Sequence, residues 1–128
     1  MTVHRRAAEY FGGAADEEGH RCLVDDVGGV QAVAYYQPKP AADRVWDLTM
    51  IAVQPGRQGV GLGTALLRRI EDELIKEGQR LLLVDTSGTA QYDRTRAFYV
   101  RSGYDQEAHV RDYWTAGDDL VIFRKALA

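Results

Sequence analysis

A glycine-rich loop that runs into an amphipathic helix limits the possible folds of this chain more than any other feature. Four glycines fall within the eight residues of the range 56–63, and residues 61–77 then place leucine and isoleucine at helical spacing. Gly78 follows at a position where glycine commonly ends a helix. Because β-rich segments at residues 44–53 and 81–84 flank this unit, we predict a strand, a helix and a second, parallel strand.

The predicted helix separates its apolar side chains from its charged ones. Six residues are expected on the buried face, namely Leu62, Leu66, Leu67, Ile70, Leu74 and Ile75. The charged residues between positions 68 and 77, Glu71 among them, are expected on the opposite face. After the helix, the uniformly apolar run Leu81–Val84 predicts a central strand that is buried on both faces.

The strand predicted over residues 44–53 has an irregular apolar pattern. Its apolar residues have even numbers at Trp46, Leu48 and Met50 and odd numbers at Ile51 and Val53. Since strand side chains alternate between faces, the apolar set changes face after Met50. A β-bulge, which inserts one extra residue, would explain this change and would free backbone groups to meet a ligand. Burial of the strand on both faces is the alternative explanation.

The remaining segments predict an α+β domain with a mixed, mostly antiparallel sheet. They are a hairpin of residues 20–27 and 30–36, a helix of residues 93–102, and two final strands of residues 104–114 and 119–125. Residues 3–11 are expected to be the end of a helix. We therefore expect one domain over residues 1–128, with one parallel strand pair and flanking helices.

Composition argues against several classes of protein. The 128 residues include 16 Lys and Arg and 19 Asp and Glu, which gives a net charge of −3 and no general attraction to nucleic acid or to a membrane surface. Cys22 is the only cysteine and the three histidines are widely spaced, so we expect no internal disulfide and no metal site. Without a long apolar run or a secretory signal, a cytoplasmic protein is expected.

The glycine-rich loop itself predicts a binding site for a diphosphate. The start of a helix offers free N–H groups and a partial positive charge, and Gly61 and Gly63 would allow a ligand to approach the backbone. The loop lacks the lysine of a Walker motif and the third glycine of a dinucleotide fingerprint. A turn that only lets the helix pack on the sheet is the alternative explanation.

These motifs together resemble those of a known enzyme family. The pattern Gln58-x-x-Gly61-x-Gly63 is similar to the Gln/Arg-x-x-Gly-x-Gly/Ala signature of the GNAT superfamily of acyl-CoA-dependent N-acyltransferases. The segment Ile51–Val53 looks like the family's bulged strand, and residues 97–104 look like its second motif. The resemblance covers residues 20–126. It implies a GNAT-like fold and transfer of an acetyl group from acetyl-CoA to a small-molecule or peptide amine by direct attack in a ternary complex.

The resemblance also implies roles for individual residues. The pantetheine arm of acetyl-CoA would pair with the backbone of Ile51, Ala52 and Val53, where a free amide would also stabilise the oxyanion. The diphosphate would bind the loop and the helix start, at Gln58, Gly59, Val60, Gly61, Leu62, Gly63 and Thr64. Tyr99 would protonate the leaving thiolate, and Asp47, acting through a water, would be the general base.

Each of these roles has a simpler structural alternative. Tyr99 would otherwise be an aromatic residue that packs on the sheet, and Asp47 an aspartate that binds a neighbouring loop. Asp85 is a second candidate for the base. Asp118 and Asp119, which lie beside two aromatic residues, would receive a cationic amine or merely cap a turn.

The sequence departs from the family in two places. Tyr92 stands where the family commonly has an asparagine that contacts CoA, so that contact is not expected here. We expect the strand and helix that usually begin the fold to be reduced to residues 3–11, which predicts an N-terminally short domain. The strand at residues 20–27 would then be a bare edge, open to the partner subunit of a homodimer. A CoA-binding module with little or no turnover is the alternative function.

Overall fold

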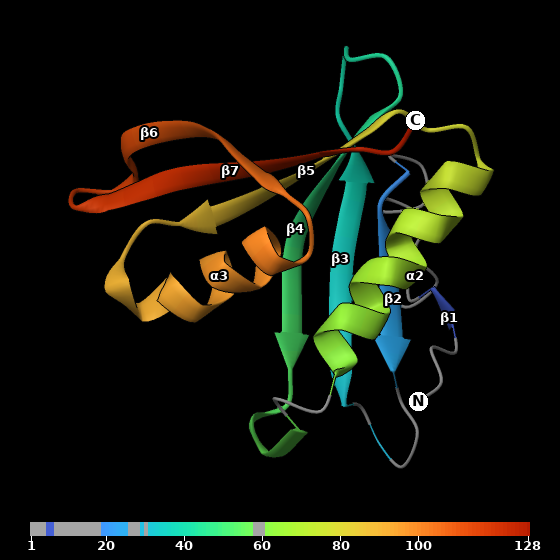
Figure 1. Cartoon of the computed structure of the whole chain (residues 1–128), viewed down its shortest axis with the longest axis horizontal. Coiled ribbons are helices and arrows are strands. Elements are labelled where there is room, and N and C mark those ends of the chain that lie inside the picture. The colour runs from blue at the N-terminus through green and yellow to red at the C-terminus, as the bar shows by residue number, and fades with distance from the viewer. Residues whose placement is uncertain (1–4, 7–18, 26–28, 30, 58–60) are drawn as a thin grey trace.

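The computed structural model describes residues 5–6, 19–25, 29, 31–57 and 61–128. In this part of the chain, seven strands form one sheet in the order β1-β2-β3-β4-β5-β7-β6 (Figure 1). The strands are β1 (Arg5–Arg6), β2 (Arg21–Asp25), β3 (Ala32–Pro38), β4 (Val45–Val53), β5 (Leu81–Ser87), β6 (Asp105–Thr115) and β7 (Asp118–Ala126). The helices are α2 (Leu62–Lys76) and α3 (Asp93–Arg101), with the short 3-10 helices η2 (Pro55–Arg57) and η3 (Ala90–Tyr92).

The sheet confirms the predicted α+β fold with one parallel strand pair. Strands β4 and β5 are parallel, and α2 connects them. Every other neighbouring pair in the described sheet is antiparallel, including the predicted hairpins β2–β3 and β6–β7. Helix α2 crosses one face of the sheet over β2 and β3, and α3 lies beside β4 and β5 (Figure 1). No helix in the described ranges is long and apolar enough to cross a membrane.

Helix α2 forms where its apolar stripe predicts, but the burial of two residues differs from the prediction. Gly61 at the N-cap and Gly78 beyond the C-terminus have φ angles of 85° and 76°, which glycine adopts easily. Ile75 is 49% exposed, whereas Glu71 is only 5% exposed. Successive helical residues are about 100° apart, so Glu71 and Ile75 both lie beyond Leu67 on the same margin of the stripe, and Ile75 is the further out of the two. Glu71 is next to the stripe, and polar partners surround it there.

Strand β4 contains the predicted bulge and is also partly buried on both faces. Tyr35 pairs with Met50 and Tyr36 pairs with Leu48, so Thr49 is the extra residue. The four residues Val45–Leu48 are all buried, whereas Thr49 and Met50 are exposed. The two explanations of the irregular pattern therefore describe different halves of the same strand. Strand β5 is buried mainly on one face, contrary to the prediction, because Leu81 and Leu83 are only half-buried.

The first residues of the chain differ from the prediction. Arg5 and Arg6 form a strand that pairs with Val24 and Leu23 of β2, so the helix predicted over residues 3–11 is wrong at these two positions. The rest of that predicted helix lies outside the described residues. Strand β2 is consequently not a bare edge at Leu23 and Val24, because β1 satisfies backbone groups that a helix would leave unpaired.

Candidate active site

The candidate site is a pocket at the point where β4 and β5 separate. Val45–Leu48 of β4 pair with Leu81–Val84 of β5, and beyond these residues the two strands diverge (Figure 1). Beyond this point the only neighbouring strand is β3 for β4 and β7 for β5, within the described structure. A pocket of about 410 Å³ occupies the divergence. Its lining residues are Thr49, Met50, Ile51, Val84, Asp85, Thr86, Ser87, Tyr92, Thr95, Tyr99, Trp114 and Asp118.

The bulge of β4 shapes one wall of this pocket. The hydroxyl of Thr49 donates a hydrogen bond of 3.1 Å to the carbonyl of Tyr35, which holds the extra residue against β3. Ile51 packs against the main core on the α2 side of the sheet, while the exposed Met50 points to the other side. The predicted Ile51–Val53 segment therefore borders the pocket at Ile51, with a strand neighbour on one edge only.

Tyr99 projects from α3 into the pocket and is also part of an aromatic cluster. Its buried ring lies 5.1 Å from the ring of Phe98 and 5.7 Å from those of Tyr104 and Phe123. Burial raises the pKa of the Tyr99 phenol above its usual range, so the group is protonated at neutral pH. Tyr99 thus packs in the core and lines the pocket at the same time, although the sequence offered packing as an alternative to a role in the site. Tyr92, Thr95 and Tyr99 share one face of the η3–α3 segment at spacings of three and four residues.

Asp47 and Asp85 lie on the face of the sheet opposite α2. Alternation from the core residues Leu48 and Val84 places them there, and Asp47 pairs with Leu83 across the parallel strands. Asp47 is 5% exposed, and its Oδ2 lies 3.4 Å from Nζ of Lys39. Within the described part of the chain, its Oδ1 has no hydrogen-bond partner. Only Asp85 of the two lines the pocket. Desolvation, and then the charge of Asp47, raise the pKa of Asp85, although Lys39 partly offsets them.

The β6–β7 hairpin closes the pocket on the side away from β4. The indole Nε1 of Trp114 donates a hydrogen bond of 3.2 Å to the carbonyl of Thr86. The hydroxyl of Ser87 donates one of 2.5 Å to Oδ1 of Asp118. Asp119, in contrast, does not line the pocket and accepts bonds from the ring of His109 at 2.6 Å and from a backbone amide of the hairpin at 2.9 Å.

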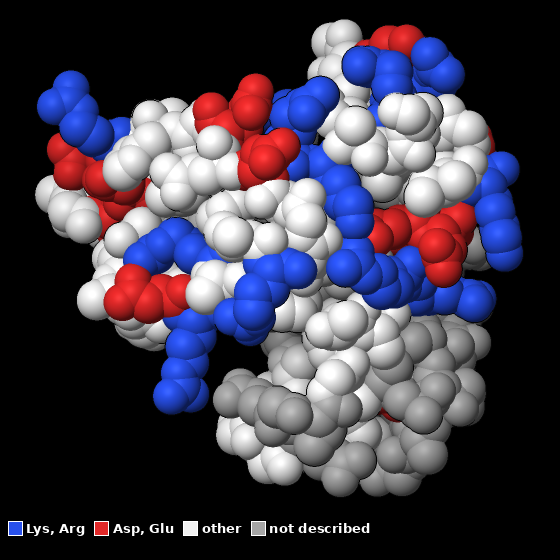
Figure 2. Space-filling model, viewed as in Figure 1, with Lys and Arg blue, Asp and Glu red and all other residues white. Residues whose placement is uncertain are grey.

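The glycine-rich loop is only partly described. Gln58, Gly59 and Val60 lie outside the described residues, while Gly61, Leu62, Gly63 and Thr64 form the start of α2. A Cβ on Gly63 would lie 3.6 Å from Phe98 and 3.8 Å from Val53, which are ordinary contacts. Packing against the described residues therefore does not require glycine at position 63. Lys and Arg side chains also gather between α2 and α3 on this face, with acidic side chains beside them (Figure 2).

Sequence reasoning missed several residues of the pocket and named others. Thr49, Met50 and Thr95 were not singled out as site residues, although the spacing of Thr95 from Tyr92 and Tyr99 was a readable signal. The structure brings Tyr99, Ile51 and the rival acid Asp85 together around one pocket. It places Asp47 behind Asp85 rather than in the lining.

Comparison with known proteins gives a consistent family. Residues 3–104 match the model of the Acetyltransferase (GNAT) family. A Desulfovibrio desulfuricans protein assigned to that family is 37% identical, with a TM-score of 0.86 over 94% of this chain and 76% of its own. Among curated protein sequences, none matches this chain.

Two further solved structures share the fold. The ribosomal-protein-S18-alanine N-acetyltransferase of Escherichia coli is 27% identical, with a TM-score of 0.69 over 85% of this chain and 68% of its own. The Salmonella typhimurium protein yncA, solved with its cofactor acetyl-CoA, is 22% identical, with a TM-score of 0.74 over 90% of this chain and 69% of its own.

Proposed function

The chain belongs to the GNAT family of acetyltransferases and is an N-acetyltransferase of EC class 2.3.1, and from this premise we propose that it transfers the acetyl group of acetyl-CoA directly to an amine while both are bound. The pocket between the diverging strands carries this proposal. Its lining residues come from both faces of the sheet, with Tyr99 on the α2 side and Asp85 on the other. A thioester and an amine bound in this pocket would therefore meet between these two side chains.

The start of α2 fits the diphosphate of acetyl-CoA. The first N–H groups of a helix have no partner within the helix, and those of Gly61–Thr64 would face the phosphates, with Gln58, Gly59 and Val60 before them. Gly63 supports this role, because the described residues leave space for a side chain there. The β4 backbone at Ile51, Ala52 and Val53 would hold the pantetheine arm as an added strand. Acetyl-CoA would supply an activated acetyl group as a thioester.

Two protons must move during the transfer. The amine nitrogen forms a bond to the acetyl carbon, the carbon–sulfur bond breaks, and the nitrogen loses a proton as the sulfur gains one. Tyr99 would donate the proton to sulfur, which its protonated phenol at the pocket wall supports. Asp47 would accept the proton from nitrogen through a water, since its Oδ1 is buried and has no hydrogen-bond partner among the described residues. A backbone amide near Ile51 would stabilise the oxyanion.

Replacing Tyr99 tests this assignment. Tyr99→Phe should lower kcat by about 100-fold, a typical contribution of a general acid, and leave the Kd of acetyl-CoA unchanged. The assay is thiol release with a panel of amines, combined with calorimetric titration of acetyl-CoA. Tyr104→Phe is the matched control, since Tyr104 is also buried in the aromatic cluster but does not line the pocket. Equal kcat values for the two variants would exclude Tyr99 as the acid.

The identity of the base is tested separately. Asp47→Asn should lower kcat and remove the acidic limb of the pH profile, because the acceptor of the proton is lost. Asp85→Asn should chiefly raise the KM of the amine. Loss of the acidic limb in Asp85→Asn alone would transfer the role of base to Asp85. Binding of CoA without acetylation of any amine would instead favour a CoA-binding module with little or no turnover.

A further inference from the structure

The charges that line the pocket point to the kind of amine that enters it. Asp85 and Asp118 contribute two carboxylates, and none of the described lining residues is Lys, Arg or His. Asp47 adds a third carboxylate behind Asp85, which Lys39 partly offsets. Because like charges repel strongly in a partly buried site, this pocket favours cations and opposes a ligand that carries its own carboxylate.

The two lining carboxylates occupy different positions along the pocket. Asp118 is bound to the hydroxyl of Ser87, which lies two residues beyond Asp85 on the same face of β5. Residues two apart in a strand are separated by roughly 7 Å, so the carboxylates mark two separate cation positions. Asp85 lies near the bulge of β4, where the acetyl group would be presented. Asp118 lies on the hairpin side.

Trp114 adds an aromatic face to the position at Asp118. Its indole N–H is already bound to the carbonyl of Thr86, so the ring is held at the pocket wall. The side chain of Trp114 is also half-exposed. A cation can bind the face of an indole as well as a carboxylate, and Trp is the best of the aromatic residues for this contact.

We propose that the acceptor is a small diamine without a carboxylate, whose reacting amine is held near Asp85 and whose second ammonium group binds Asp118 and Trp114. This inference rests on the proposed acetyl transfer and adds the substrate class. Asp118 and Trp114 are then specificity residues. Free amino acids are excluded because their carboxylate would enter a pocket that already contains two.

Matched amines test the substrate class with acetyl-CoA as donor. Cadaverine is lysine without its carboxylate, and pentylamine is cadaverine without its second amine. We expect kcat/KM for cadaverine to exceed the values for lysine and for pentylamine by at least tenfold. Asp118→Asn should lower kcat/KM for cadaverine more than for pentylamine, so that the preference falls toward one. Asp119→Asn is the control, because Asp119 is next to Asp118 but binds His109 and does not line the pocket. This variant should retain the preference for cadaverine.

A binding measurement separates failure of this inference from failure of the proposed function. Cadaverine is titrated calorimetrically into the complex with CoA, using the chain and its Asp118→Asn variant. Binding that requires Asp118, without acetylation of any amine, would uphold the diamine site and reject the acetyl transfer. Acetylation with equal preference for lysine and cadaverine, or a preference for a peptide N-terminus, would overturn the diamine site and retain the transfer. Neither binding nor acetylation would reject both.

Discussion

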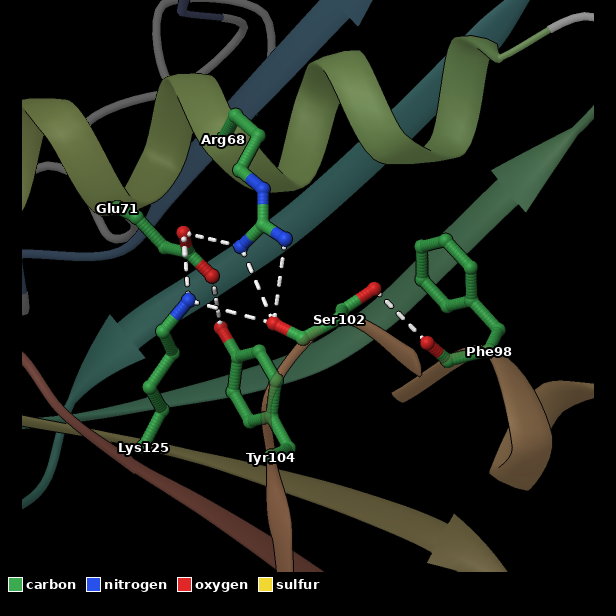
Figure 3. Close-up of polar contacts among 6 residues, drawn as sticks. All are labelled: Arg68, Glu71, Phe98, Ser102, Tyr104 and Lys125. Carbon is green, nitrogen blue, oxygen red and sulfur yellow. Dashed lines mark hydrogen bonds and ion pairs between the residues drawn. The ribbon is translucent and has the colours of Figure 1, made fainter. Parts of the chain in front are cut away.

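Glu71→Gln should destabilise the chain, because the buried carboxylate of Glu71 joins three segments through polar contacts (Figure 3). Its Oε1 accepts a 2.8 Å bond from Arg68 and a 3.2 Å bond from Lys125, and its Oε2 accepts a 2.6 Å bond from the hydroxyl of Tyr104. Arg68 and Lys125 also bind the carbonyl of Ser102, just beyond the end of α3, at 3.2 and 3.3 Å. The contacts thus link α2, the end of α3 and β7.

The expected loss of stability follows from these contacts. A hydrogen bond to a charged group contributes about 1.5–3 kcal/mol, and glutamine would lose the charge and present an amide to a cation. The side chains of Arg68 and Lys125 are 43% and 27% exposed, so water can replace part of what they lose. We expect a net loss of about 2 kcal/mol. With an unfolding entropy of about 2.1 cal/mol/K per residue, this lowers Tm by about 7 °C.

Urea unfolding followed by circular dichroism measures this loss. Asp72→Asn is the matched control, since it removes the same charge from the next residue of α2 on an exposed position and should change stability by less than about 0.5 kcal/mol. Tyr104→Phe removes only one of the bonds and should cost less than Glu71→Gln. The reasoning fails if Glu71→Gln unfolds at the same urea concentration as Asp72→Asn.

Three further substitutions test the loop and the pocket. Gly61→Ala should lower the free energy of unfolding by about 1 kcal/mol, because the φ of Gly61 is 85°. Gly63→Ala should raise the free energy of unfolding by about 0.5–1 kcal/mol, because alanine has the higher helix propensity and a Cβ makes only ordinary contacts there. Urea unfolding that ranks the two variants the other way would contradict this. Asp85→Asn should raise Tm at pH 7 more than at pH 4. The raised pKa of Asp85 favours the folded state below the ordinary carboxyl pKa of 3.8, and this contribution is lost as pH rises through the folded pKa. A gain in Tm that is independent of pH would refute the argument.

Most of the fold was predictable because its signals are local. The helical spacing of leucines in α2 and the glycines that follow both helices depend on the chain within a few residues. The paired strand β1 could not be predicted in this way. Arg5 and Arg6 have no strand signal of their own, and they are extended because β2 offers them an edge. Such pairing depends on tertiary context, which overrides local preference.

The burial of Glu71 shows where helical periodicity stops being informative. A carboxylate at the margin of an apolar stripe is normally solvated, so its position in α2 predicts exposure. It is buried because Lys125 and Tyr104, which are more than 30 residues away in the sequence, supply its partners. The surroundings of Asp47 could not be predicted for the same reason. Its contact with Lys39 and its position outside the pocket lining depend on how three strands are arranged.

The position of the pocket, in contrast, can be predicted from the composition of β5. The strand is apolar over Leu81–Val84, where it has β4 on one side and β7 on the other, and polar over Asp85–Ser87, where only β7 remains. A strand between two neighbours places at least one of its faces in the core, so it tolerates few polar side chains there, whereas a strand beside a pocket can carry them. The change after Val84 coincides with the bulge of β4, which follows Leu48. Two changes of pattern in separate segments thus indicate one event, the separation of the parallel strands at which acetyl transfer would occur.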